Sequence, residues 1–326
     1  MELYVSVIGG INLDIKGRPA AALLPETSNP GDVYTSAGGV GRNIAHNLAL
    51  LGTPVYLFGA VGNDAFGSRI LSETKVAGVN VTYVRVLPDQ PTGIYLSILN
   101  AAHDLAVAIS AMDVTEAVDI AYLNEHREVL QGSRFVVADA NLAAEVLNYV
   151  LELCQHAQIP CLLEPVSVDK AQKIQTLGAA CDYLTPNRAE LEALAQRPCR
   201  DVAMQHPGRG VALQRLYEVC AALRHRCRHL LVKSGAAGVY HYDCAQQAGT
   251  WYPPMPTPVV DPNGAGDAFA AGFICGVCRG LTMATAIRFG LAAAHLTLQA
   301  KDTVNANMSF EACSGLVTGM NYKDLG

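Results

Sequence analysis

Asp261-Pro262-Asn263-Gly264-Ala265-Gly266-Asp267, with Ala268-Phe269-Ala270-Ala271-Gly272 directly behind it, is the most informative stretch of this sequence. Two glycines that bracket an alanine leave backbone N–H groups uncovered just before an apolar helical pattern. The start of a helix adds unpaired N–H groups and the positive end of the helix dipole. The pattern therefore predicts an anion-binding cradle at a helix N-terminus, although a plain glycine-rich turn capping a core helix fits the same residues.

Asp267 stands at the mouth of this cradle, where a carboxylate can take a proton from an attacking hydroxyl. An anion hole with a base beside it suits phosphoryl transfer, which depends mainly on positioning and charge stabilisation. We therefore expect Gly264, Ala265 and Gly266 to form the anion hole and Asp267 to act as the general base. The alternative for Asp267 is a helix N-cap.

The composition describes an acidic chain with a large aliphatic core. Its 326 residues are 51% hydrophobic and carry a formal net charge of −6, which fits two average domains or one large α/β domain with an appendage. Nucleic acid is not an expected partner, because the sequence has no Lys or Arg cluster. The first residues form neither a basic leader nor a long apolar run, so we expect no membrane partner and a cytoplasmic location.

Ten cysteines are scattered along the chain, and only Cys275 and Cys278 have the spacing of a zinc pair. The sequence has no second such pair and no suitably spaced His cluster, which argues against a zinc site. We expect buried, reduced thiols.

Short apolar runs alternate with helical patterns along most of the chain. This alternation predicts a mostly parallel sheet with helices on both faces and with functional sites at the carboxyl ends of the strands. The expected strands include Leu3–Ile8, Val55–Phe58, Phe135–Ala138, Cys161–Leu163, Tyr183–Thr185 and Leu230–Lys233, and the expected helices include Asn43–Leu51, Phe66–Ala77, Ala143–Ala157, Ala189–Leu194, Ala212–His225, Ala268–Cys278 and Met283–Gln299.

A helix-free region near residues 84–110 interrupts this rhythm. Val84–Val86, Gly93–Leu99 and Leu105–Ile109 are expected to be strands joined by turns. Together with Ile15–Thr35 they predict a small sheet that projects from the main body.

A second glycine-rich motif, Gly38-Gly39-Val40-Gly41-Arg42-Asn43, precedes the expected helix Asn43–Leu51. It is neither a dinucleotide-binding fingerprint nor a P-loop. Gly38 and Gly39 would let a substrate approach the backbone closely, and the Asn43 amide can bind hydroxyls.

Five motifs in the same order along the chain resemble the ribokinase (PfkB-type) family of carbohydrate and nucleoside kinases. They are Asn12-Leu13-Asp14, Gly38–Gly62, Asn187-Arg188-Ala189-Glu190, Lys233–Gly238 and Asp261–Ile274, which together cover nearly the whole chain. The resemblance implies one ribokinase-like α/β domain over residues 1–326. Its central sheet would carry helices on both faces and a discontinuous β-sheet lid from about residues 12–36 and 84–112.

The resemblance also implies where ligands bind. ATP is expected against Asn187, Lys233, Ser234, Gly235, Gly238, Asn263, Gly264 and Gly266, and the acceptor against Asn12, Asp14, Gly38, Gly39, Asn43 and Asp139. Glu190 would reach Mg²⁺ through water, and Asp261 would belong to a monovalent-cation site, for which K⁺ is the expected ion. Structural alternatives stay open: Asn187 and Glu190 can satisfy a helix start, Lys233 can be a solvated strand end, and Asp261 can cap a turn.

Further segments resemble the pseudouridine kinases of this family, namely Ser28–Gly31, Gly38–Ala45, Asn47–Gly52, Glu125–Arg127 and Val137–Asn141. This implies ATP-dependent phosphorylation of a nucleoside 5′-hydroxyl, under a lid that also pairs two copies into a homodimer. A sister kinase for ribose, another nucleoside or a hexose is the first alternative. A nucleoside-binding protein without catalysis is the second.

Overall fold

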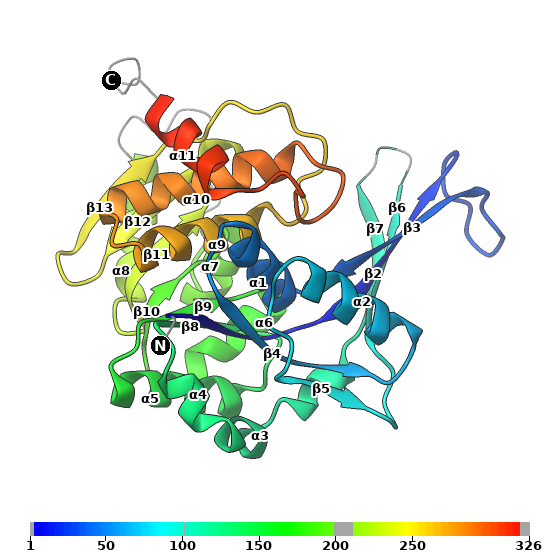
Figure 1. Cartoon of the computed structure of the whole chain (residues 1–326). Coiled ribbons are helices and arrows are strands. Elements are labelled where there is room, and N and C mark those ends of the chain that lie inside the picture. The colour runs from blue at the N-terminus through cyan, green and yellow to red at the C-terminus, as the bar shows by residue number, and fades with distance from the viewer. Residues whose placement is uncertain (1–2, 101, 103, 199–210, 320–326) are drawn as a thin grey trace.

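The computed structural model of the chain describes residues 3–100, 102, 104–198 and 211–319 (Figure 1). These residues form a nine-stranded main sheet and a separate four-stranded sheet. The strands of the main sheet, in spatial order, are β13 (Ala248–Tyr252), β12 (Val239–Asp243), β11 (Cys227–Lys233), β10 (Cys181–Leu184), β9 (Cys161–Glu164), β8 (Phe135–Asp139), β1 (Val5–Ile8), β4 (Val55–Gly62) and β5 (Val84–Leu87). The β11–β12 and β12–β13 pairs are antiparallel and the other neighbours are parallel. This confirms the mostly parallel α/β architecture.

Helices cover both faces of the main sheet, and each helix layer packs against its face to form a separate hydrophobic core. One layer contains α1 (Val40–Leu50), α2 (Ala65–Val76), α9 (Ala265–Cys278), α10 (Met283–Leu298) and α11 (Phe310–Gly319). The other contains α3 (Ile120–Glu125), α4 (Arg127–Gln131), α5 (Ala144–Ala157), α6 (Val168–Ala171), α7 (Arg188–Ala195) and α8 (Val211–Ala222). All residues of β1, β8 and β9 are buried, because a parallel strand between two helix layers has no face toward water.

Small residues in α9 allow it to pack closely against α10. A Cβ on Gly272 would lie 2.8 Å from the Cβ of Ala293 and 2.8 Å from the carbonyl oxygen of Phe289. A larger residue would push the two helices apart, so the Ala- and Gly-rich run after Asp267 fixes where the N-terminus of α9 lies.

Although this helix pair is strongly apolar, none of the helices in the described ranges is long and apolar enough to span a membrane.

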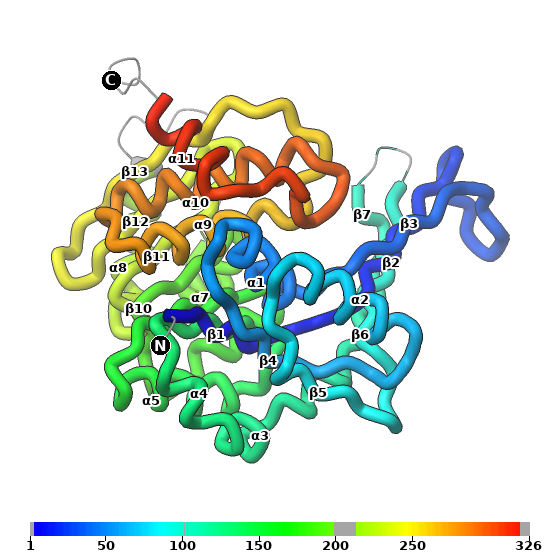
Figure 2. The backbone as a smooth tube through the Cα atoms, viewed as in Figure 1, coloured from blue at the N-terminus to red at the C-terminus, as the bar shows by residue number. Residues whose placement is uncertain are grey.

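The four-stranded sheet projects from the body, and we call it the lid sheet. Its spatial order is β3 (Gly31–Gly38), β2 (Asn12–Pro19), β6 (Gly93–Leu99) and β7 (Leu105–Ala111). Figure 2 shows the chain running from β1 in the body into β2, with Gly9 and Gly10 in the short junction. The lid sheet therefore begins at the carboxyl edge of the main sheet, where the sequence predicts the site.

The strand β5 corrects one expectation about the lid sheet. The sequence predicts that the second half of this sheet starts near residue 84, but Val84–Leu87 pairs in parallel with β4 in the main sheet. The β4–α2–β5 segment is a strand–helix–strand unit whose second strand returns beside the first. Because β5 is short and only partly buried at the sheet edge, its residue pattern resembles that of the lid strands.

Candidate active site

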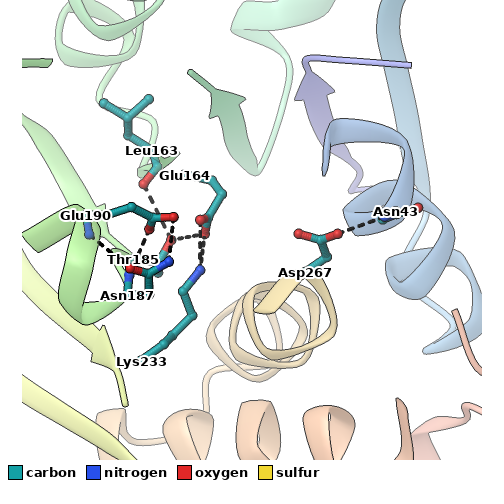
Figure 3. A network of polar contacts seen from close by, with 8 residues as sticks. All are labelled: Asn43, Leu163, Glu164, Thr185, Asn187, Glu190, Lys233 and Asp267. Carbon is teal, nitrogen blue, oxygen red and sulfur yellow. Dashed lines mark hydrogen bonds and ion pairs between the residues drawn. The ribbon is translucent and has the colours of Figure 1, made fainter. Parts of the chain in front are cut away.

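Polar side chains gather at the carboxyl ends of the parallel strands, where sites of this fold class lie. Asp139 ends β8, Glu164 ends β9 and Lys233 ends β11, while Asn187 follows β10 as the N-cap of α7. Figure 3 shows the Lys233 side chain, from β11, beside the helix α9 that carries Asp267. The start of α9 thus lies against the strand ends.

Asp267 lies in the first turn of α9 and is half-buried. The amide Nδ2 of Asn43, on α1, donates a hydrogen bond of 2.8 Å to its Oδ2. Burial raises the pKa of Asp267 to about 7; repulsion from Glu164 and Asp139 adds to the rise, and Asn43 and Lys233 oppose it. A carboxylate that titrates near neutral pH is well matched to general-base chemistry.

The backbone before Asp267 forms the predicted cradle. Gly264 is the N-cap of α9 in the left-handed region, with φ 78°. The first bond of the helical ladder runs from Ala268 N–H to Gly264 O, at 2.9 Å, so the N–H groups of Ala265, Gly266 and Asp267 precede that ladder. A Cβ on Gly264 would collide with the carbonyl oxygen of Thr303. Backbone angle and space therefore both require glycine here.

Lys233 brings a positive charge to this cradle. Its Nζ lies 2.8 Å from both carboxylate oxygens of Glu164, and it would lie 3.3 Å from a Cβ placed on Gly266. Burial alone would lower the pKa of Lys233, but the carboxylates of Glu164 and Glu190 outweigh burial and raise it. A charged ammonium thus stands beside bare backbone, an arrangement that suits an anionic ligand.

Asn187 and Glu190 form a capping box at the start of α7. The Glu190 N–H donates to Asn187 Oδ1 at 2.9 Å, and the carboxylate of Glu190 accepts from the Asn187 N–H at 2.8 Å and its Nδ2 at 2.7 Å. The structural alternative for this pair is therefore realised in the fold. Both carboxylate oxygens of Glu190 thus accept a capping bond, and the residue is 3% exposed.

Comparison with known proteins identifies the family of this site. Residues 2–309 match the model of the pfkB family carbohydrate kinases. The chain belongs to this family. Pseudouridine kinase of Escherichia coli is 34% identical to it over 96% of each chain, and ribokinase of Bacillus subtilis is 27% identical over 98% of each chain. The structure of Arabidopsis thaliana ribokinase complexed with ribose and ATP covers 98% of this chain and 100% of its own, with a TM-score of 0.78 and 23% identity, a likeness of fold.

The protein is therefore a kinase of the ribokinase type, a phosphotransferase that uses ATP and acts on a sugar or nucleoside acceptor. Figure 3 gathers the residues around its strand ends. Asp267 faces Asn43, and Lys233 faces Glu164.

The strand and turn after β11 are expected to contact ATP. Some of these residues face open space, whereas others pack against the protein. Ser234 Oγ is buried and has no hydrogen-bond partner within the described residues, and a Cβ on Gly235 would meet open space. Gly238, with φ 98°, packs so tightly that a Cβ would collide with the Tyr252 carbonyl oxygen. The glycine at 238 therefore allows β12 and β13 to meet, whereas the backbone at Gly235 is open and the Ser234 hydroxyl is buried without a partner in the described part of the chain. Asn263 is exposed in the loop before α9.

The residues expected to bind the acceptor lie on β2 and in the glycine motif. Asn12 Nδ2 donates to Asp14 Oδ1 at 2.6 Å, and burial raises the pKa of Asp14, opposed by Asn12, Arg42 and Lys16. Gly38 is buried, and a Cβ on it would collide with the Asp14 carboxylate.

The space beside Gly38 is thus filled by the protein's own carboxylate. Gly39, with φ 97°, similarly faces the backbone of Gly10. Both glycines make room for neighbouring protein groups, which differs from the expectation that a substrate approaches them directly.

Asp139 is completely buried. Its Oδ2 accepts from the N–H of Gly10 at 2.9 Å and of Gly41 at 2.7 Å, and its Oδ1 accepts from the Asn141 N–H at 2.9 Å. With both oxygens occupied and no exposed surface, Asp139 is not open to a substrate, contrary to the expected binding role. It holds β8, the lid junction and α1 together.

Arg42 was not among the expected site residues. It is 3% exposed, and its guanidinium donates to the carbonyl oxygens of Gly38, at 3.4 Å, and of Ala37. Burial lowers the pKa of Arg42 to about 10, while attraction to Asp14 and Asp267 opposes the fall. One buried cation therefore interacts with the carboxylates of both Asp14 and Asp267. The glycine motif shows the residue, but only the fold reveals its burial.

Asp261 does not present a free carboxylate to a monovalent cation. Its Oδ2 lies 2.8 Å from the Nζ of Lys16 on β2, and its Oδ1 accepts from the Asn263 N–H at 2.9 Å. Both oxygens are engaged by groups of this chain. The expected K⁺ site therefore does not fit the donor set that the structure presents.

Proposed function

We propose that this kinase transfers the γ-phosphoryl group of ATP to the 5′-hydroxyl of pseudouridine, giving pseudouridine 5′-phosphate and ADP. The main support for the acceptor is the 34% identity to Escherichia coli pseudouridine kinase over 96% of each chain. The support for the chemistry is Asp267, whose pKa of about 7 places a base beside the cradle of bare amides.

Asp267 takes the proton of the acceptor hydroxyl as that oxygen attacks phosphorus. Asn43 holds one carboxylate oxygen by its 2.8 Å hydrogen bond, which leaves the other oxygen for the hydroxyl. The N–H groups of Ala265, Gly266 and Asp267 stabilise charge on the transferred group, and the Lys233 ammonium adds a positive charge beside them. Asp139 and Glu164 act through other residues. Asp139 holds the backbone N–H of Gly10 in place, and Glu164 holds the Lys233 ammonium.

Asn12 and Asp14 hold hydroxyls of the sugar ring from the lid sheet. The Asp14 carboxylate is kept in place by the Asn12 amide and by the charge of Arg42. We propose that the lid sheet closes over the acceptor and excludes water, which would otherwise compete for the phosphoryl group.

Mg²⁺ fits the carboxylates near Lys233. Glu190 and Glu164 repel each other, and burial together with this repulsion raises the pKa of Glu190. Hard oxygen ligands of this kind suit Mg²⁺, which commonly keeps its waters and binds substrate phosphates. In the described part of the chain, no group of three or more His, Cys, Asp or Glu could hold a metal. We propose that Glu190 would hold the ion through water, as the resemblance of its motif implies, and that the ion would neutralise phosphate charge.

A homodimer through the lid sheet is part of the proposal. The face of this sheet opposite Asp14 carries Val33, Val107 and Ile109, which are 55–70% exposed. An apolar sheet face of this kind is typical of an interface. Light scattering of the wild type and of Ile109→Lys tests it: a dimer that the lysine converts to monomer is expected, and a monomeric wild type would contradict it.

Ribose is the second candidate acceptor, because the ribokinase of Bacillus subtilis is 27% identical over 98% of each chain. A panel of pseudouridine, uridine, ribose and fructose, with coupled detection of ADP, separates the candidates. We expect kcat/KM for pseudouridine to exceed the others by at least about 10-fold, since polar pockets discriminate strongly. If the enzyme prefers ribose, the proposal of pseudouridine as acceptor is wrong, but the proposed phosphoryl-transfer chemistry still holds. Binding without ADP production would support the non-catalytic alternative.

A further inference from the structure

Lys16 connects the lid sheet to the anion-hole loop. It follows Asp14 by two residues on β2, so both side chains lie on the same face of the lid sheet. Its Nζ lies 2.8 Å from Asp261 Oδ2, across 245 positions of sequence. The side chains of Lys16 and Asp261 are 30% and 19% exposed, so the pair is partly shielded from water.

Asp261 needs a compensating positive charge because of where it lies. It stands three residues before Gly264, at the start of the loop that leads into the cradle for phosphate groups. An uncompensated carboxylate here would repel the polyphosphate. Without Lys16, the Asp261 carboxylate would keep its hydrogen bond from the Asn263 N–H but lose its contact with the lid sheet. The ammonium of Lys16 neutralises this carboxylate and fixes its second oxygen.

We propose that Lys16 is a built-in cation that positions the anion-hole loop, so that this kinase requires no K⁺ or other monovalent cation at Asp261. The lysine does there what a bound ion would do: it balances the carboxylate and holds the loop in shape. The inference rests on the kinase family of the chain and is independent of which acceptor is phosphorylated. It also makes Lys16 a positioning residue, since its partner is Asp261 and not a reacting atom.

A direct test locates the cation without any turnover. Crystals of the wild type and of Lys16→Met are soaked in Rb⁺, which replaces K⁺ and is seen by anomalous scattering. We expect no Rb⁺ beside Asp261 in the wild type and a bound Rb⁺ in Lys16→Met. The double variant Lys16→Met/Asp261→Asn lacks the carboxylate and should bind none. Rb⁺ at Asp261 in the wild type, or its absence in Lys16→Met, would overturn the proposal.

Kinetics supply the second readout, with ADP release measured in tetramethylammonium buffer and then with K⁺ at constant ionic strength. Wild-type kcat should change less than about 2-fold, whereas Lys16→Met should lose about 10-fold or more without K⁺, as expected for a misplaced catalytic loop. K⁺ should restore most of that loss. The matched control is Arg18→Met, two residues further along the same strand, which should behave like the wild type.

Each other kinetic outcome counts against the inference. Severalfold K⁺ activation of the wild type would show that Lys16 does not replace the ion. A Lys16→Met variant with unchanged kcat, or with a loss that K⁺ does not restore, would show that Lys16 has no cation role at Asp261. If Lys16→Met fails to fold, Lys16→Gln removes the same charge and takes its place. If pseudouridine is not the acceptor, the substrate panel will show no turnover with it. The Rb⁺ experiment does not depend on that outcome.

Discussion

Replacing Asp267 with Asn removes the proposed base and also a charge that the fold disfavours. The pKa of Asp267 rises from its ordinary value of 3.8 to about 7, chiefly through burial. One pKa unit corresponds to about 1.36 kcal/mol, so ionising this carboxylate in the folded protein costs at most about 4 kcal/mol. Because the residue is only half-buried, solvent screening reduces this to about 2 kcal/mol.

The sign of the pH dependence follows from the two pKa values of Asp267. Between pH 4 and 7 the unfolded chain has lost the proton while the folded protein still holds it, so wild-type stability falls as pH rises through this window and is level above it. Asn carries no charge at any pH. The stability gain of Asp267→Asn over the wild type should therefore be near zero at pH 4 and reach its full value by pH 8.

The assay is urea denaturation of both proteins at pH 4.5 and pH 8, combined with kcat from ADP release at pH 8. We expect Asp267→Asn to be more stable at pH 8 by about 2 kcal/mol and to lose about 10²–10⁴ in kcat. The control is Asp169→Asn, an exposed aspartate in the first turn of α6, which should keep wild-type turnover. Near-wild-type kcat in Asp267→Asn would refute the base assignment. Equal or lower stability at pH 8 would refute the burial argument.

Three further predictions concern the surroundings of this base. The kcat/KM of the wild type should rise with pH and level off above about pH 7, because Asp267 must be ionised. Asn43→Leu should shift this rise to higher pH, since the Asn43 amide lowers the pKa of Asp267. A pH–rate profile of both enzymes tests this, and identical profiles would contradict it. Gly264→Ala should lower the free energy of unfolding by at least about 1–3 kcal/mol, because φ 78° and the neighbouring carbonyl both exclude a Cβ; an alanine variant of wild-type stability in urea would contradict this. Glu164→Gln should lower the pKa of Lys233 and raise KM for ATP more than KM for the acceptor, since the Lys233 ammonium loses its carboxylate partner; equal changes in both constants would count against a role beside phosphate.

The strand–helix rhythm and the order of the motifs were enough to predict the fold, because each pattern reports a local property. Apolar runs report burial on both faces, and Gly264 reports a left-handed turn. The error at β5 arose where local pattern is ambiguous: a short, partly buried strand has the same pattern in either sheet. Its partner depends on the path of α2, which the sequence does not encode locally.

Within the site, the sequence could indicate residues but not their partners. Asn187 and Glu190 fit both a metal motif and a capping box, and the coordinates show the capping bonds. Asp139 ends a strand as a ligand-binding acid would, yet its oxygens are taken by backbone N–H groups. Lys16 gave no sequence signal, and Arg42 appeared only as a member of the glycine motif, since the importance of both comes from carboxylates distant in sequence.

A crystal structure with pseudouridine and a non-hydrolysable ATP analogue tests the central claim most directly. The account predicts that the 5′-oxygen lies about 2.6–3.2 Å from a carboxylate oxygen of Asp267. The terminal phosphate should lie against the backbone N–H groups of residues 265–267. A nucleoside bound away from the carboxylate, or a terminal phosphate outside this cradle, would contradict it.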